Sequence, residues 1–262
     1  GQCAQACRLP YGLLVDGERR EQGDMNYLLS PQDLMALPWL PQLIEAGVHC
    51  LKIEGRLKGP EYVHRTVSAY RAALDRAWAA QDTGTPLADT APTLAQRRRL
   101  AQVFSRGQDA HADGLTPGFL LGPRHQELVI GRNPRHRGLL LGQISTVDRR
   151  GVTLELANPV KAGDGVVFDQ GNPQARELGG NVYAVVRCGQ PVRGEVDAGE
   201  VTLSFAADLP LHRLQPGDRV WRSKDAAMDA GPRLARAADH GRVPTRITVE
   251  LRLGQPLRLT LE

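Results

Sequence analysis

Apolar and polar positions alternate with two different periods along the chain, and the first period is helical. Pro60 opens PEYVHRTVSAYRAALDRAWAA, where apolar residues recur three and four positions apart and predict a long amphipathic helix. One face of that helix carries Val63, Val67, Tyr70, Ala73, Leu74 and Trp78. Ahead of it, VHCLKIEGR (48–56) has the composition of a buried strand, and LPYGLLVDG (9–17) that of a short one.

The segment between residues 26 and 47 predicts a second helix. Ser30 is a favourable N-cap, and Pro31 suits the first helical position. We expect an interruption near Pro38 and Pro41 and an end at Gly47. The order over 26–80 is then β-α-β-α, which is typical of a parallel α/β sheet. Two such units are too few for a closed barrel, so they predict a small sheet or the tail of a larger α/β domain.

From about residue 138 the period becomes two. LLLGQISTVDRRGVTLEL predicts two strands joined by a turn at Asp148–Gly151. NPVKAGDGVVFDQ and LHRLQPGDRVWRSKD repeat one pattern, a Gly-Asp turn followed by an alternating strand. We therefore expect a small β-barrel domain over 138–224, followed over 225–262 by a helix (225–240) and a hairpin (246–262) that start a further module.

Residues 81–137 connect these two parts. QDTGTPLADTAP has the composition of a linker, LAQRRRLAQVFSR predicts a basic helix, and the stretch after it is rich in Gly, Pro and His. RNPRHRG places Arg132, Arg135 and Arg137 close together. Guanidinium groups suit phosphate, so these three are candidate RNA-binding residues. The alternative is an ordinary solvated loop.

Composition narrows the class of protein. The 262 residues are 41% hydrophobic and carry a formal charge of +4, which permits an anionic partner without requiring one. No apolar run is long enough to span a membrane and no secretion leader is visible, so we expect a cytoplasmic protein. No zincin, Walker, serine-hydrolase or dinucleotide motif occurs in the sequence.

Cysteines supply the first candidate chemistry. The four lie at positions 3, 7, 50 and 188, and in a reducing compartment we expect free or metal-bound thiols. Cys3 and Cys7 are spaced so that a turn would bring both sulfurs to one metal. Zinc sites and iron–sulfur clusters usually need four ligands, so this pair is half a set, and two ordinary thiols are the alternative.

Charged residues in LKIEGR (51–56) are the second candidate for a functional site. Lys52, Glu54 and Arg56 alternate along the predicted strand and would share one face at its carboxyl end. That end is where α/β sheets place their ligand sites, so these are the candidate catalytic residues. A structural ion pair is the alternative.

Three stretches together resemble the peptidase U32 (collagenase-like) family. They are GQCAQACRLPY, then YLLSPQDLMALPWLPQLIEAGVHCLKIEGRLKGPEYV, then GFLLGPRHQELVIGRNPRHRG, and the resemblance covers about 1–138. The branch that they resemble most is the long bacterial 23S rRNA cytidine hydroxylases, which are related to the prephenate-dependent tRNA uridine hydroxylases.

This resemblance implies a fold and a cofactor. Residues 1–80 would be the C-terminal portion of a TIM-like barrel whose front lies outside this chain. Cys3 and Cys7 would be two ligands of a [4Fe–4S] cluster whose other two ligands lie upstream. Lys52 and Arg56 would face the anionic groups of prephenate, with Glu54 orienting them.

The resemblance also implies hydroxylation at C5 of a pyrimidine in RNA, either a 23S rRNA cytidine or a tRNA uridine. RNA, ribosomal or transfer, is then the expected partner. A U32 peptidase is the first alternative, and a non-catalytic RNA-docking fragment is the second. As an RNA hydroxylase, the chain by itself is expected to be inactive, and the sequence leaves its oligomeric state open.

Overall fold

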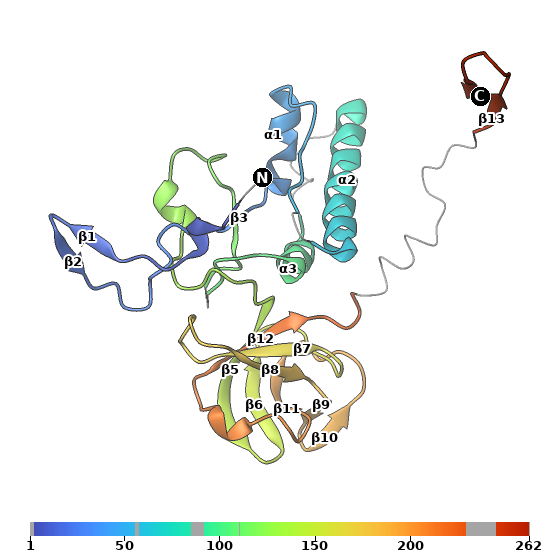
Figure 1. The fold of residues 1–262 in the computed structure, drawn as a ribbon. Helices are drawn as coiled ribbons and strands as arrows, with labels where there is room; N and C mark the ends of the chain where they lie inside the picture. Colours follow the sequence, from blue (N-terminus) through green and yellow to red (C-terminus); the bar gives the residue numbers. More distant parts are fainter. Residues whose placement is uncertain (1–2, 56–57, 85–91, 110, 229–244, 262) are drawn as a thin grey trace.

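The computed structural model describes residues 3–55, 58–84, 92–109, 111–228 and 245–261 (Figure 1). Its helices, within those ranges, are α1 (Leu40–Glu45), α2 (Pro60–Thr83), α3 (Leu94–Val103) and the short 3₁₀ turns η1 (Ala6–Arg8), η2 (Leu37–Trp39), η4 (His125–Leu128) and η5 (Leu211–Arg213). The strands of the first half are β1 (Leu13–Val15), β2 (Glu18–Arg20), β3 (Asp33–Leu34) and β4 (Leu115–Thr116).

The second half is dominated by one curled antiparallel sheet (Figure 1). Its strands are β5 (Leu139–Asp148), β6 (Gly151–Leu156), β7 (Gly165–Asp169), β8 (Leu178–Asn181), β9 (Ala184–Arg187), β10 (Gln190–Val192), β11 (Gly199–Ser204) and β12 (Arg219–Lys224). They pair in the order β10-β9-β11-β6-β5-β12-β7-β8, so β10 and β8 are the edges. Aliphatic side chains at alternate positions fill the inside of the curl, as the period of two predicted.

The two Gly-Asp turns have the same construction. Gly163 and Gly217 both take a positive φ, at 90° and 96°. The carboxylate that follows each glycine accepts a 3.0 Å bond from the backbone N–H three residues before it, at Asp164 and Asp218. The strands that leave these turns, β7 and β12, then pair with each other. The repeated motif therefore supplies two adjacent strands of the sheet, next to the β8 edge.

Helices α2 and α3 form where the sequence predicts them, and the predicted apolar face of α2 is confirmed in part, because Tyr70, Ala73 and Leu74 pack on the core. Ala73 and Ala77 are buried, whereas Val63, Val67 and Trp78 are exposed. A second, smaller core joins Met35, Leu37, Leu40, Ala73 and Leu100. The middle of the predicted face thus packs on this core, and the residues at its two ends are exposed.

The helix expected to start at Ser30 is absent. Ser30 is buried and its hydroxyl accepts a hydrogen bond from Arg8, so it does not cap a helix. Pro31 instead bridges Val129, and β3 pairs in parallel with β4. Helix formation begins later, at η2 and α1, and Gly47 ends it at a φ of 78° as predicted.

The strand predicted over 48–56 is also absent. Residues 48–55 form no strand, and Cys50 is exposed. The parallel pairing of this half joins β3 to β4, which come from segments far apart in the sequence. Without a paired neighbour, the alternating pattern has no sheet to define its two faces. The TIM-like barrel stays a prediction.

The last part of the chain is described only in part. The predicted helix over 225–240 begins as a turn at 225–228, and most of its length lies outside the described residues. The predicted hairpin is confirmed as β13 (Ile247–Glu250) paired with β14 (Arg258–Leu261). None of the described helices has the length and apolar character to cross a bilayer.

Candidate functional site

The first cysteine pair lies on a short turn. Cys7 sits in η1, and the turn is made by Gln5, whose φ of 54° places it in the left-handed region. Both Cys3 and Cys7 are exposed thiols. In the described part of the chain, no cluster of three or more His, Cys, Asp or Glu side chains is arranged to hold a metal. The pair therefore offers two soft ligands and no third.

Two arginines lie near Cys7: Arg8 follows it in the chain, and the negative charge of a Cys7 thiolate favours the charged forms of both Arg8 and Arg106. Most of this charged group was not predicted from the sequence. Arg106 binds Asp33 side-on, with Nη2 2.5 Å from Oδ1 and Nε 3.1 Å from Oδ2. The backbone N–H of Arg106 donates to the same carboxylate at 2.8 Å. Arg8 donates through Nη1 to the Ser30 hydroxyl at 2.6 Å and to the Pro31 carbonyl at 2.5 Å. Asp33, in β3, thus anchors Arg106.

Lys58, two residues before α2, lies over the same aromatic ring as Arg106. Its Nζ lies 3.1 Å from the centroid of the Phe104 ring, and Arg106 lies over the same ring at 5.0 Å. Burial lowers the pKa of the Lys58 ammonium, and the positive charge of Arg106 lowers it further. Burial and then Arg106 also lower the pKa of the Arg8 guanidinium. We call Arg8, Lys58 and Arg106 the cation cluster.

Aromatic and imidazole rings form one wall of this region. Phe104 packs edge-on against Tyr62 at 6.0 Å and lies 5.4 Å from the His136 ring. His136 Nδ1 lies 3.1 Å from the backbone nitrogen of Ser105. Burial lowers the pKa of His136, so its imidazole is neutral at neutral pH and adds no charge to the cation cluster. Burial raises the pKa of the Tyr62 hydroxyl, which donates to the Glu54 carbonyl.

The candidate catalytic residues are only partly described. Lys52 and Glu54 form an ion pair at 3.5 Å, and their side chains are 85% and 71% exposed. Arg56 lies outside the described residues. The structure thus brings the first two together on the surface, in the open rather than in a buried site, and their catalytic role stays a prediction.

The three candidate RNA-binding arginines have different surroundings. Arg132 forms a 3.4 Å ion pair with Asp24 and is partly exposed. Arg135 is exposed and donates to the Ala175 carbonyl at 3.2 Å. Arg137 is buried, with Nη1 2.7 Å from Asp169 Oδ2 and with Glu177 as a second partner. Because both its partners are inside the protein, the position of Arg137 does not support the role in RNA binding predicted for it.

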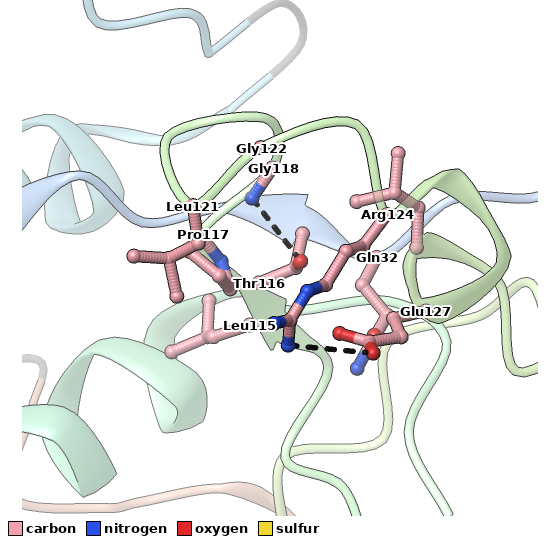
Figure 2. Close-up of a pocket in the computed structure, with 10 residues that line it drawn as sticks. Gln32, Leu115, Thr116, Pro117, Gly118, Leu121, Gly122, Arg124 and Glu127 are labelled. Carbon is pink, nitrogen blue, oxygen red and sulfur yellow. Dashed lines mark hydrogen bonds and ion pairs between the residues drawn. The ribbon is translucent and has the colours of Figure 1, made fainter.

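A shallow pocket lies beside β4, with a volume of about 130 Å³ (Figure 2). Its lining includes Gln32, Thr116 and the loop at 117–122, with an Arg124–Glu127 ion pair at 3.8 Å across its rim. The Thr116 hydroxyl accepts a hydrogen bond from the Gly118 N–H and keeps its own proton to donate. The pocket has room for a small group only.

Comparison with known proteins gives a family and several relatives. Residues 1–130 match the profile described as "Peptidase family U32". The tRNA hydroxylation protein P1 of Bacillus subtilis is 32% identical over 64% of this chain and 39% of its own length. The 23S rRNA 5-hydroxycytidine C2501 synthase of Escherichia coli is 31% identical over 63% of this chain and 24% of its own.

A relative with a different kind of name also matches. A collagenase of Porphyromonas gingivalis is 29% identical over 85% of this chain and 57% of its own length. The chain therefore spans between about a quarter and three fifths of these curated relatives. No solved structure matches the chain significantly.

Proposed function

The chain belongs to peptidase family U32 through residues 1–130, and from this we propose that it is part of an enzyme that hydroxylates C5 of a pyrimidine in RNA. The observation that carries the proposal is the similarity to two proteins named for RNA hydroxylation, one for tRNA and one for 23S rRNA. The substrate nucleotide would be a tRNA uridine or a rRNA cytidine.

Surface charge supports an RNA partner. The chain has a formal charge of +4, and Arg132 and Arg135 keep their guanidinium groups at least partly exposed. Exposed guanidinium groups bind phosphate through charge-assisted hydrogen bonds and release counterions. Arg132 and Arg135 are therefore retained as RNA-contacting residues, and the buried Arg137 is assigned to holding the fold.

Cys3 and Cys7 fit a [4Fe–4S] cluster as two of its ligands. Their exposure and the turn at Gln5 leave both sulfurs free to bind, and thiolates are the ligands that iron–sulfur clusters prefer. The remaining ligands would come from outside the described residues. When bound, such a cluster supplies one-electron chemistry near the substrate.

Prephenate is proposed as the cosubstrate. Its carboxylates would be held by Lys52 and Arg56, and Glu54, which pairs with Lys52 at 3.5 Å, would orient the ammonium group. The proposal rests on charge, because a carboxylate ligand needs cations of this kind.

The test is a comparison of RNA from a deletion strain and its parent. Nucleosides from total tRNA and rRNA are separated by chromatography and identified by mass spectrometry. We expect one hydroxypyrimidine to be absent from the deletion strain and to return on complementation. The second candidate function is a collagenase-like protease, favoured by the P. gingivalis relative. Cleavage of a collagen-like peptide by the purified protein, with unchanged hydroxypyrimidines in the deletion strain, would select that alternative.

A further inference from the structure

The cation cluster beside Cys7 carries more positive charge than the surrounding described residues balance. Asp33 is its one carboxylate partner within ion-pair distance in the described part of the chain, and Arg106 occupies that carboxylate with two side-chain nitrogens and its backbone N–H. The charges of Asp33 and Arg106 therefore cancel. Arg8 and Lys58 remain as two cations without a described carboxylate in contact.

These two cations are also half-buried, which makes the imbalance costly. Arg8 bonds a hydroxyl and a carbonyl through Nη1, and both of these acceptors are neutral. Lys58 lies over the Phe104 ring, which offers a weaker attraction than a carboxylate does. Burying a cation disfavours its charged form unless an anion compensates it. The surroundings of Arg8 and Lys58 thus favour an added negative group.

We propose that Arg8, Lys58 and Arg106 form a binding site for one oxyanion group, a carboxylate or a phosphate, of a small ligand held beside Cys7. The ammonium of Lys58 and the nitrogens of Arg8 other than Nη1 are the donors, because no described acceptor uses them. Arg106 contributes through its charge while it stays bound to Asp33. The inference goes beyond the proposed function and does not depend on which reaction the protein performs.

The form of the site favours a small ligand over an RNA strand. Proteins that bind the phosphate backbone of RNA do so with extended rows of exposed basic side chains, which follow successive phosphates. Here Arg106 is the common neighbour: it shares the Phe104 ring with Lys58, and its charge lowers the pKa of both Lys58 and Arg8. Tyr62 and His136 pack against the same Phe104 ring. One compact anion with an apolar body would satisfy the charges and contact the rings.

Calorimetric titration of the full chain with inorganic phosphate and with succinate, at constant ionic strength, tests the site. We expect saturable binding of at least one of the two, and which one binds tells phosphate from carboxylate. Lys58→Gln should weaken that binding by about tenfold or more, the loss expected when a charge-assisted hydrogen bond is removed. Lys58→Arg, which keeps the charge, should restore most of it.

Two matched variants complete the test. Arg149→Gln removes an exposed cation from the turn between β5 and β6 and should leave anion binding unchanged. Arg8→Gln should weaken it as Lys58→Gln does, and circular dichroism checks that the fold persists. Binding of neither anion, equal loss in Arg149→Gln, or binding of an RNA oligonucleotide alone would overturn the proposal. So would binding that appears only in Cys7→Ser, because the Cys7 thiolate would then be the missing counter-ion.

Discussion

Arg137 belongs to a sequence pattern that predicts RNA binding, but its position in the structure gives it a role in stabilising the fold. It belongs to the RNPRHRG tract, yet its guanidinium lies between Asp169 and Glu177 and is 3% exposed. Its removal takes the nearest cation from both carboxylates in a poorly solvated place, although Asp169 keeps a longer contact of 3.7 Å with Arg219.

Arg137→Ala should therefore lower the free energy of unfolding by about 3–5 kcal/mol. Arg135→Ala, an exposed change in the same tract, should change it by less than about 1 kcal/mol. Urea unfolding monitored by circular dichroism measures both. Equal and small effects of the two substitutions would show that the buried network does not stabilise the fold.

His136 gives a pH dependence whose sign follows from its burial. Its pKa in the folded protein is lowered, whereas in the unfolded chain it is about 6.5. As the pH falls below about 6.5, the unfolded chain takes up the proton first and unfolding becomes easier. This part of the stability is present above pH 6.5 and is lost toward the folded-state pKa.

We expect the free energy of unfolding to drop less between pH 7.5 and 5.5 in His136→Gln than in the unchanged protein. The control is His212→Gln, which alters an exposed histidine in η5. Urea titrations at the two pH values provide the comparison. A drop in His136→Gln as large as that in the parent protein would assign the pH dependence to other groups.

At the scale of elements, helix α3 fixes how the segment before the sheet is attached to it. Thr93 and Gln96 form a reciprocal capping box, with bonds of 3.2 Å and 2.8 Å. From the other end of the helix, Gln102 donates to the Arg222 carbonyl on β12. The cap and the contact with the sheet thus lie at opposite ends of α3.

Thr93→Ala should lower the free energy of unfolding by about 1 kcal/mol, since it removes the cap acceptor. Thr93→Ser keeps the hydroxyl and should retain most of the stability. Thermal unfolding of the three proteins side by side checks this. Identical midpoints for Ala and Ser at this position would be inconsistent with the capping box.

In the segment at 48–55, a substitution of Lys52 distinguishes a role in stability from a role in catalysis. Lys52 and Glu54 are exposed, and exposed ion pairs contribute little to stability. Lys52→Ala should change the free energy of unfolding by less than about 1 kcal/mol. If Lys52 binds the cosubstrate, the same variant should lose RNA hydroxylation while it stays folded; full activity would remove it from the site.

Elements with a regular period and their own turn signals could be predicted from the sequence. The strands after 138, the two Gly-Asp turns, α2, α3 and the C-terminal hairpin follow directly from such patterns. The absence of the helix predicted to start at Ser30 could not be predicted, because the Ser30 hydroxyl is bound by Arg8, which lies 22 residues away in the sequence. The cation cluster was missed for the same reason, since Asp33 and Arg106 lie 73 residues apart.

At the scale of the whole molecule, two distinct cores divide the described residues. One lies inside the curled sheet, and the other joins α1, α2 and α3 with the segment around Met35. The family match covers the second of these and ends before the sheet begins. The Cys7 turn and the cation cluster therefore belong to the part of the chain that carries the family resemblance.

The most direct measurement of the central claim is the nucleoside composition of RNA from a deletion strain complemented with defined variants. The account predicts that the unchanged gene restores one hydroxypyrimidine in tRNA or rRNA, that Cys3→Ser combined with Cys7→Ser does not, and that Arg149→Gln does. A deletion strain whose hydroxypyrimidines equal those of its parent would contradict the account.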